Sequence, residues 1–191
     1  MSTVERHTRS ERGLTLSHLE SGPTDAPVVI GLHGFLDTAT SFVPLMEALS
    51  DRWRWVVPDQ RGYNLSDKPA DLAAYAIDKL VEDIADLVDH VGAPIHLVGH
   101  DWGGVVAWAF ANAYPERLKG LIIANAPHPD VFAREYAENP EQKAASSYIT
   151  FFMSPTAESM LANNDYALLA ESLVPVLTDE ELARYKQAWS Q

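Results

Sequence analysis

A carboxylate stands at the position where a sharp turn after a strand would present a nucleophile. The segment Gly99–Gly104, with the sequence GHDWGG, directly follows the apolar run Ile95–Val98. A strand, a Gly-x-nucleophile-x-Gly turn and a helix together form a nucleophile elbow, whose strained turn lifts one side chain clear of the sheet edge. Here that side chain is Asp101 and not a serine. A carboxylate that attacks carbon leaves an ester on the protein, so the residue type narrows the reaction class.

Two other blocks follow predicted strands, at the sheet edge where ligand sites of open α/β folds lie. The block His33–Asp37 (HGFLD) follows the predicted strand 26–32, and the block Asp59–Pro69 (DQRGYNLSDKP) follows a second predicted strand. Gly34 lets the backbone approach closely, and the N–H near Phe35 is a candidate oxyanion donor. Together with the elbow, these blocks predict one site at the carboxyl ends of the strands.

Apolar periodicity predicts the elements that must position these blocks. Continuous apolar runs indicate four strands buried on both faces, as in parallel sheets, and stretches with helical spacing lie between them. This order predicts an α/β fold with a doubly wound, mostly parallel sheet. Residues 14–20 alternate as a half-buried edge strand does, and Gly92 is predicted to end a helix. The predicted strands are 26–32, 53–57, 95–98 and 118–124, and the predicted helices are 42–49, 77–91 and 105–114.

Beyond Pro129 the alternation ends, and only helices are predicted. Asn139 begins an N-cap pattern with proline at N1, which opens a helix through about residue 152. Thr178 begins a capping box before the helix 182–189. We therefore predict two domains: residues 1–129 form the N-terminal part of an α/β core, and residues 130–191 form a partial helical cap, or lid.

Composition and charge exclude several classes of function. The chain has 191 residues and a formal net charge of −13 with no basic stripe, which argues against nucleic-acid binding. It has no cysteine, so disulfides and thiol chemistry are excluded. Residues 1–12 lack the apolar stretch of a secretory signal, and no apolar run is long enough to span a bilayer. These features predict a cytoplasmic protein.

The three blocks together resemble the α/β-hydrolase fold, specifically its epoxide hydrolase and haloalkane dehalogenase branch. That branch has a His-Gly-x-Pro block, an Asp-x-Arg-Gly-x-Gly-x-Ser-Asp-x-Pro loop and a Gly-x-Asp-Trp-Gly elbow. The segments 114–117 (YPER), 125–129 (NAPHP) and 146–152 (SSYITFF) are more similar to epoxide hydrolases than to dehalogenases. Two positions depart from the pattern: Leu36 replaces the proline, and Asn64, which tolerates positive φ, replaces a glycine.

The resemblance implies hydrolysis of epoxides to vicinal diols through a covalent ester on the protein. Asp101 would attack a ring carbon, and Tyr148 on the lid would donate a hydrogen bond to the epoxide oxygen. Backbone N–H groups of Phe35 and Trp102 would form the oxyanion hole. The implied substrate is a small apolar epoxide, and neither a metal nor an organic cofactor is required. The residues expected to line the substrate pocket are His33, Phe35, Trp102, Phe151 and Phe152.

The resemblance also implies parts that this sequence does not supply. The family has a second half of the sheet, an Asp or Glu partner and a catalytic His after the lid, whereas this sequence stops at Gln191, within the expected lid. The chain is therefore predicted to be truncated, and turnover by these residues alone is left open. The strand 118–124 would be internal in a complete fold but an open edge here, which predicts self-association or cover by a missing C-terminal half.

Two other functions remain open. A haloalkane or haloacid dehalogenase also begins with carboxylate attack on carbon, but Phe35 stands where many haloalkane dehalogenases have Asn, and Asn125 where some have an acid. Fluoroacetate-type dehalogenases share His-Gly-Phe but usually have Arg where this chain has Trp102. The second alternative is a catalytically incomplete fragment or binding module that lacks the His base.

Structural roles compete with chemical ones at several positions. Tyr148 is one aromatic among several, so packing alone would explain it, and His33 also has the character of a bracing residue. Asp59 and Arg61 are expected to pin loops and not to contact substrate. The acidic side chains of the helix 77–91 are expected to form a solvated face. These side chains are Glu82, Asp83, Asp86 and Asp89.

Overall fold

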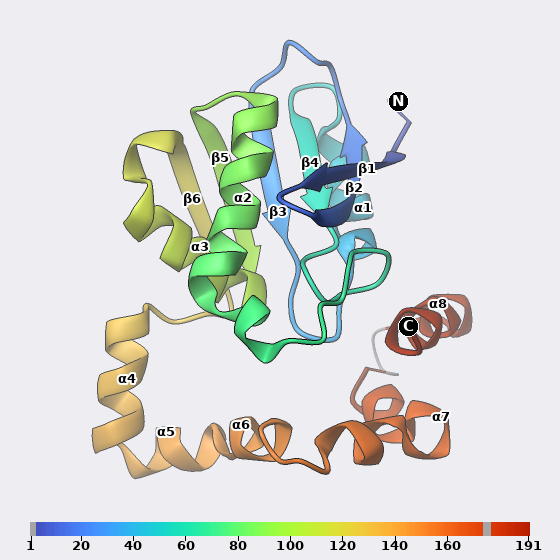
Figure 1. Ribbon diagram of the computed structural model, residues 1–191, viewed down its shortest axis with the longest axis vertical. Helices are drawn as coiled ribbons and strands as arrows, with labels where there is room; N and C mark the ends of the chain where they lie inside the picture. Colours follow the sequence, from blue (N-terminus) through green and yellow to red (C-terminus); the bar gives the residue numbers. More distant parts are fainter. Residues whose placement is uncertain (1–2, 174–176) are drawn as a thin grey trace. The chain divides into compact units, whose positions relative to one another are not determined.

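The computed structural model describes residues 3–173 and 177–191. The chain divides into two compact units, Met1–Ala126 and Pro127–Gln191, and each is described by itself. The division falls shortly before the boundary predicted at residue 129. Figure 1 labels the strands and the α-helices of both units. Among the described residues, no helix combines the length and apolar character that a membrane crossing requires.

A six-stranded sheet forms the centre of the first unit, in the order β1-β2-β4-β3-β5-β6. The four strands from β4 to β6 run parallel, whereas β2 is antiparallel to both of its neighbours. The predicted α/β fold with a mostly parallel sheet is therefore confirmed. The strands are β1 Glu5–Glu11, β2 Leu14–Ser21, β3 Val28–Leu32, β4 Arg54–Pro58, β5 Ile95–His100 and β6 Leu118–Ala124.

The prediction that residues 14–20 form an edge strand is wrong, because β1 pairs with β2 along its whole length. Arg12 and Gly13 join the two strands with φ of 50° and 79°. Positive φ at both loop residues is typical of a tight β-hairpin turn. The side chains of β1 are almost all exposed, so the strand carries no apolar alternation in its sequence. Its backbone pairing, and not burial, defines it as a strand.

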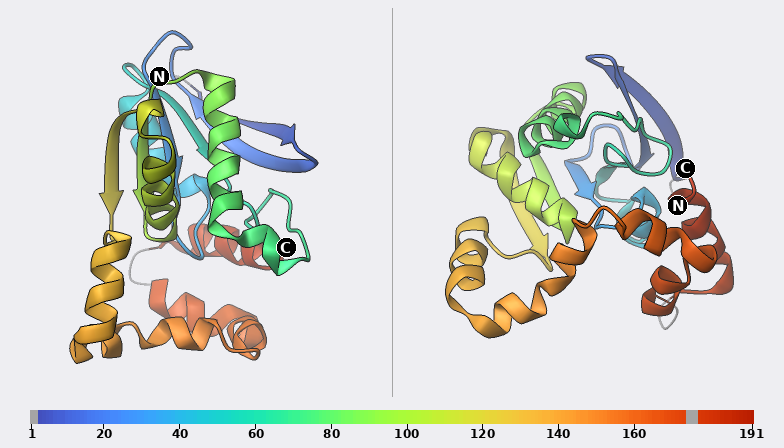
Figure 2. Two further views of the ribbon diagram at one scale, coloured as in Figure 1. Left: turned by 60° about the vertical axis from the view of Figure 1, so that its left-hand side comes forward. Right: turned by 60° about the horizontal axis from the view of Figure 1, so that its bottom comes forward.

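Helices cover both faces of the sheet, which confirms the doubly wound arrangement (Figures 1 and 2). Neighbouring residues of β3 point to opposite faces. Ile30 packs in a core with α2 and α3, whereas Val29 packs in a second core with η1 and α1. The prediction that Gly92 ends α2 is confirmed, since it has φ 91°. These helices are η1 Ala39–Phe42, α1 Val43–Leu49, η2 Leu72–Tyr75, α2 Ile77–Val91, α3 Trp102–Ala113 and η3 Pro115–Arg117.

The described part of the second unit is helical, as predicted. The single helix predicted through residue 152 is wrong, because it is broken at Ser146, which is buried and accepts a hydrogen bond from the Gln142 side chain at 2.9 Å. A second break, with non-helical backbone angles, lies at residues 163–166. The capping box at Thr178 is confirmed. The helices are α4 Pro129–Glu138, α5 Pro140–Ala145, α6 Ser147–Phe152, α7 Ala157–Leu173 and α8 Asp179–Trp189.

A half-buried carboxylate links β2 to β4. Glu20 lies 3.0 Å from Nε2 of His18 and 3.2 Å from Nη2 of Arg54. The hydrogen bond from His18, followed by the hydrogen bond and charge of Arg54, lowers the pKa of Glu20 to about 2, against the opposing effect of burial. Its ionised form is therefore stabilised by folding.

The Glu20→Gln variant is expected to lose about 1–2 kcal/mol of unfolding free energy near pH 7, after allowance for solvent screening. Because folding lowers the pKa of Glu20, its contribution is complete above the unfolded pKa of about 4.5 and disappears as the pH falls through about 2. Urea unfolding at several pH values between about 2 and 7 measures this difference. Glu5→Gln, at a side chain with 68% exposure, is the matched control. A difference that does not vary with pH would contradict the prediction.

Candidate active site

Asp101 occupies the turn between β5 and α3, with φ 50° and ψ −118°. This left-handed backbone is strained for a non-glycine residue, as the predicted elbow requires. The N–H groups of Gly104 and Val105 donate to the Asp101 carbonyl at 2.9 and 3.2 Å. The helix begins at Trp102 and not at residue 105 as predicted, since the glycines after Asp101 form part of its first turn.

Backbone packing explains the glycines of the elbow. A Cβ at Gly103 would lie 2.3 Å from the carbonyl oxygen of Leu32, and one at Gly99 would lie 2.6 Å from the carbonyl oxygen of Gly103. These neighbours are backbone atoms, so they cannot rotate away as a flexible side chain can. The two glycines therefore allow α3 to begin directly against the ends of β3 and β5.

The end of β6 is attached to the same elbow. The Asp101 N–H donates to the carbonyl of Ala124 at 2.9 Å. Asn125 then turns the chain with φ 57°. Ala126 packs so closely on α3 that a Cβ at Gly104 would lie 2.6 Å from its methyl group, and its carbonyl accepts from Nε1 of Trp108 at 3.4 Å. The last residues of the first unit are thus held on the helix that starts directly after Asp101.

The structure brings the predicted donor at Phe35 directly to the predicted nucleophile. The Phe35 N–H donates to Oδ1 of Asp101 at 2.8 Å. Gly34 permits this approach, because a Cβ there would lie 3.0 Å from the Cβ of Asp101. Phe35 and Trp102 are 41% and 37% exposed, so both residues reach the surface of the first unit.

His33, expected to line the substrate pocket, is fully buried instead. Its Nε2 accepts from the backbone N–H of Gln60 at 3.0 Å, so the proton lies on Nδ1, which donates to the Gly34 carbonyl at 2.9 Å. Burial lowers the pKa of His33, which favours this neutral form. Tyr63 packs edge-on against the ring at 4.8 Å. His33 therefore braces the loops and offers no accessible surface to substrate.

The two departures from the family pattern both adopt positive φ. Leu36 has φ 64°, a value that the ring of proline excludes, so the turn after Phe35 differs from that of a chain with proline there. Asn64 has φ 43°, consistent with its expected tolerance of this conformation, and its side-chain amide donates to Asp59 at 2.9 Å.

Asp59 and Arg61 pin loops, as predicted. Asp59 is fully buried and accepts from the Ala39 N–H at 2.9 Å and from Nη1 of Arg6 at 2.7 Å. Arg61 donates to both carboxylate oxygens of Asp83, at 2.9 and 2.6 Å. The expectation that Asp83 lies on a solvated face is therefore wrong, because this residue of α2 is buried against the loop. Burial raises the pKa of Asp83, and Arg61 opposes that effect.

Aromatic side chains gather in the second unit around α6. The rings of Tyr148 and Phe151 lie 5.9 and 5.5 Å from the ring of Phe152. Tyr148 is 54% exposed, so its side chain is accessible within this unit. These contacts are what packing alone would require, and the roles expected of the three residues toward an epoxide stay predictions.

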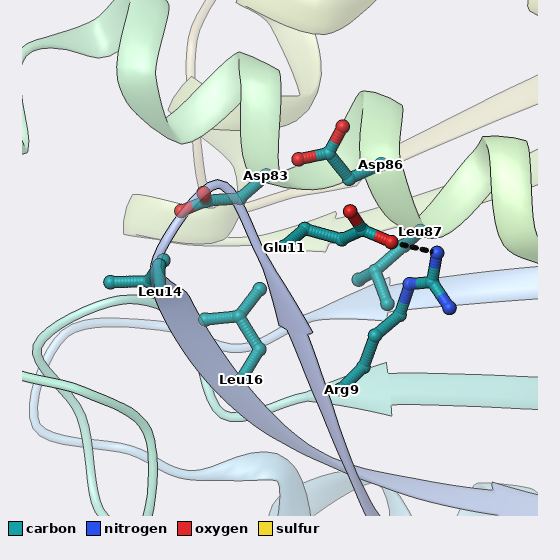
Figure 3. Close-up of a pocket in the computed structure, with 7 residues that line it drawn as sticks. All are labelled: Arg9, Glu11, Leu14, Leu16, Asp83, Asp86 and Leu87. Atoms are coloured by element: carbon teal, nitrogen blue, oxygen red, sulfur yellow. Dashed lines mark hydrogen bonds and ion pairs between the residues drawn. The ribbon is translucent and has the colours of Figure 1, made fainter.

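Surface hollows elsewhere in the first unit are separate from the elbow. One lies between the β1–β2 hairpin and α2 (Figure 3), and another lies between β2, α2 and the loop after β4. Neither is lined by Asp101 or by the block 33–37. Among the described residues, no group of His, Cys, Asp and Glu has the arrangement of a metal site. The first hollow is lined by Arg9, Glu11, Leu14, Leu16, Asp83, Asp86 and Leu87.

A family model and the sequence relatives of this chain point to the same protein family. The family model for the alpha/beta hydrolase fold matches residues 27–188. YfhM of Bacillus subtilis, an AB hydrolase superfamily protein, is 40% identical over 187 residues, which cover 94% of this chain and 65% of the relative. Mouse epoxide hydrolase 4 is 35% identical over 193 residues, which cover 95% of this chain and 54% of the relative. This chain thus spans between about half and two thirds of these relatives.

Solved structures agree with the sequence relatives. The crystal structure of Bacillus megaterium epoxide hydrolase in complex with an inhibitor matches with a TM-score of 0.90 and 32% identity, covering 96% of this chain and 66% of that one. An epoxide hydrolase from hot-environment metagenomes matches with a TM-score of 0.88 and 37% identity, covering 100% of this chain and 66% of that one. The chain therefore belongs to the α/β-hydrolase fold family and is epoxide hydrolase-like within it.

Proposed function

We propose that the protein opens small apolar epoxides to vicinal diols through an ester on Asp101. The observation that carries this proposal is the hydrogen bond from the Phe35 N–H to Oδ1 of Asp101, at 2.8 Å on the strained elbow. This bond engages one carboxylate oxygen and leaves Oδ2 as the attacking atom. The names of the relatives supply the substrate class.

In the first step, Oδ2 of Asp101 bonds to a ring carbon and the ring C–O bond breaks. The departing oxygen takes the proton of the Tyr148 hydroxyl, which leaves a hydroxyalkyl ester on Asp101. The ester carbonyl is then Oδ1, which already accepts from the Phe35 N–H.

In the second step, water adds to the ester carbonyl carbon, and the negative charge develops on Oδ1. The N–H groups of Phe35 and Trp102 stabilise that charge, at about 3–4 kcal/mol per donor in comparable oxyanion holes. The bond between the ester carbonyl carbon and the oxygen of the diol then breaks, and the diol leaves. One water proton restores the Tyr148 hydroxyl and the other remains on the diol, so one water is consumed for each epoxide.

Mass spectrometry of the protein treated with styrene oxide or phenyl glycidyl ether tests this proposal. We expect a mass increase of one epoxide, located on Asp101 by peptide mapping. In ¹⁸O-labelled water, completed turnover would place ¹⁸O in the Asp101 carboxylate. An adduct without diol would support the first step and identify a chain that needs a further base. No adduct and no diol with either epoxide, or an adduct on another residue, would overturn the proposal. Halide release from a haloalkane without epoxide opening would indicate a dehalogenase instead.

A further inference from the structure

The carbonyl of His33 connects the loop after β3 to the loop after β4 and to the elbow by hydrogen bonds. It accepts from Nε2 of the Gln60 side chain at 2.6 Å and from the backbone N–H of Gly103 at 3.1 Å. His33 is fully buried and Gln60 is 5% exposed, so water does not compete for this carbonyl. The Gln60 amide therefore fixes the orientation of the peptide that joins His33 to Gly34.

The next peptide carries the oxyanion donor itself. The Gly34 carbonyl and the Phe35 N–H belong to one planar unit, so the orientation of the first determines that of the second. This carbonyl accepts from Nδ1 of His33 at 2.9 Å and from the Asp37 N–H at 3.3 Å. On the opposite side of the same peptide, the Phe35 N–H meets Oδ1 of Asp101.

Residue 60 acts on both peptides at once. Its backbone N–H donates to Nε2 of His33 at 3.0 Å, which keeps the ring proton on Nδ1 and hence directed at the Gly34 carbonyl. Its side chain holds the carbonyl on the other side of Gly34. A buried leucine or methionine at position 60 would retain the first contact and lose the second.

We propose that Gln60 is a positioning residue, whose side-chain amide orients the Phe35 N–H toward the nucleophilic carboxylate through the backbone of His33 and Gly34. This inference rests on the proposed function, because it assigns a task to Gln60 in the reaction of Asp101. It goes beyond that function in naming a residue that neither contacts substrate nor belongs to the elbow. Its physical basis, the orientation of one peptide, can be measured without catalysis.

The Gln60→Met variant removes the amide donor at nearly constant volume. The His33 carbonyl keeps its bond from Gly103, so the loss of stability should be about one hydrogen bond. We expect the Phe35 amide proton to shift upfield in the NMR spectrum and to exchange faster with solvent, because its bond to the carboxylate weakens. We also expect the maximal rate of ester formation on Asp101 to fall roughly tenfold, with the half-saturating epoxide concentration unchanged. Gln142→Met, at a partly buried glutamine of the second unit, should leave the Phe35 amide signal unchanged.

The Gln60→Glu variant separates positioning from packing by its pH dependence. A neutral carboxylic acid keeps an O–H donor for the His33 carbonyl, whereas its ionised form turns an acceptor toward another acceptor. Relative to the unmodified protein at each pH, ester formation should recover as the pH falls from about 8 to 5, and the Phe35 amide signal should return with it. The relative rate of Gln60→Met should not change over this range.

The two readouts distinguish failure of this inference from failure of the proposed function. If no epoxide reacts with Asp101 in the unmodified protein, the proposed function fails, and the Phe35 amide still tests the role of Gln60. If Gln60→Met folds and leaves the Phe35 amide signal unchanged, the positioning role is overturned whatever the reactivity. If Gln60→Met fails to fold, the pH-dependent recovery in Gln60→Glu decides the question, and an amide signal that does not vary with pH overturns the inference.

Discussion

The Asp101→Asn variant is expected to lose ester formation with epoxides by at least about 10³-fold, because removing a nucleophile removes the step it performs. Asparagine has no anionic oxygen to attack carbon. Its side-chain carbonyl can still accept the hydrogen bond that the Phe35 N–H makes to Oδ1. Asparagine also tolerates the positive φ of 50° at this position. The folded structure should therefore persist, with an unfolding free energy within about 1 kcal/mol of the original.

Mass spectrometry of samples quenched at set times after the addition of phenyl glycidyl ether measures the loss of ester formation. Urea unfolding measures the stability of the same sample. Asp101→Ala provides a second variant, which removes both the nucleophile and the acceptor. Asp130→Asn is the matched control, since the Asp130 side chain of α4 is 93% exposed and should not affect the rate. Ester formation at the original rate in a stable Asp101→Asn protein would show that another group is alkylated.

The Arg61→Ala variant is expected to lose about 3 kcal/mol of unfolding free energy or more, because it leaves the Asp83 carboxylate buried without its partner. The two side chains are only 11% and 9% exposed, and they make two hydrogen bonds to each other. Arg61 also donates to the Ala74 carbonyl at 2.7 Å, so the short helix η2 before α2 loses a contact as well. Thermal or urea unfolding at about pH 7 gives the magnitude.

The pH dependence of this loss tests its electrostatic origin. Burial already raises the pKa of Asp83, and removal of Arg61 removes the main opposing effect. A carboxyl whose folded pKa is raised destabilises the fold only when it is ionised, so the deficit of Arg61→Ala should shrink as the pH falls toward about 4. The double variant Arg61→Leu with Asp83→Leu should be more stable than either single replacement by alanine. A deficit that is constant with pH would assign the loss to packing.

The helix Ile77–Val91 was predicted to the residue, because it has one apolar stripe and a glycine at its end. The bounds of the strand Leu118–Ala124 were also predicted, but the prediction that it is buried on both faces is wrong: its residues are half-buried or exposed, and Ile122 is 62% exposed. The strand β1 was missed because its side chains are exposed and only its backbone pairing holds it. The spacing of apolar residues in a sequence indicates which side chains are buried, so a strand whose side chains are exposed shows no apolar alternation.

The sequence predicted which residues of the candidate site lie together, but not the partners of its buried polar side chains. The carboxyl ends of parallel strands meet, so the proximity of Asp101 and Phe35 followed from their places after two such strands. The partner of a buried polar group depends instead on the packing of distant segments. Asp83 on α2 has the sequence pattern of a surface residue, and only the fold shows that it pairs with Arg61. Gln60 lies in the block 59–69 but at the variable position of its Asp-x-Arg-Gly pattern, so the sequence assigns its side chain no partner.

The attachment of Ala126 to α3 fixes the end of the first unit on the helix that follows Asp101. Ala126 is the last residue of the first unit, and it is held by packing on Gly104 and by the indole of Trp108. We therefore expect changes in the helices that follow to be accommodated beyond this anchored point, so that the backbone of Asp101 stays in place.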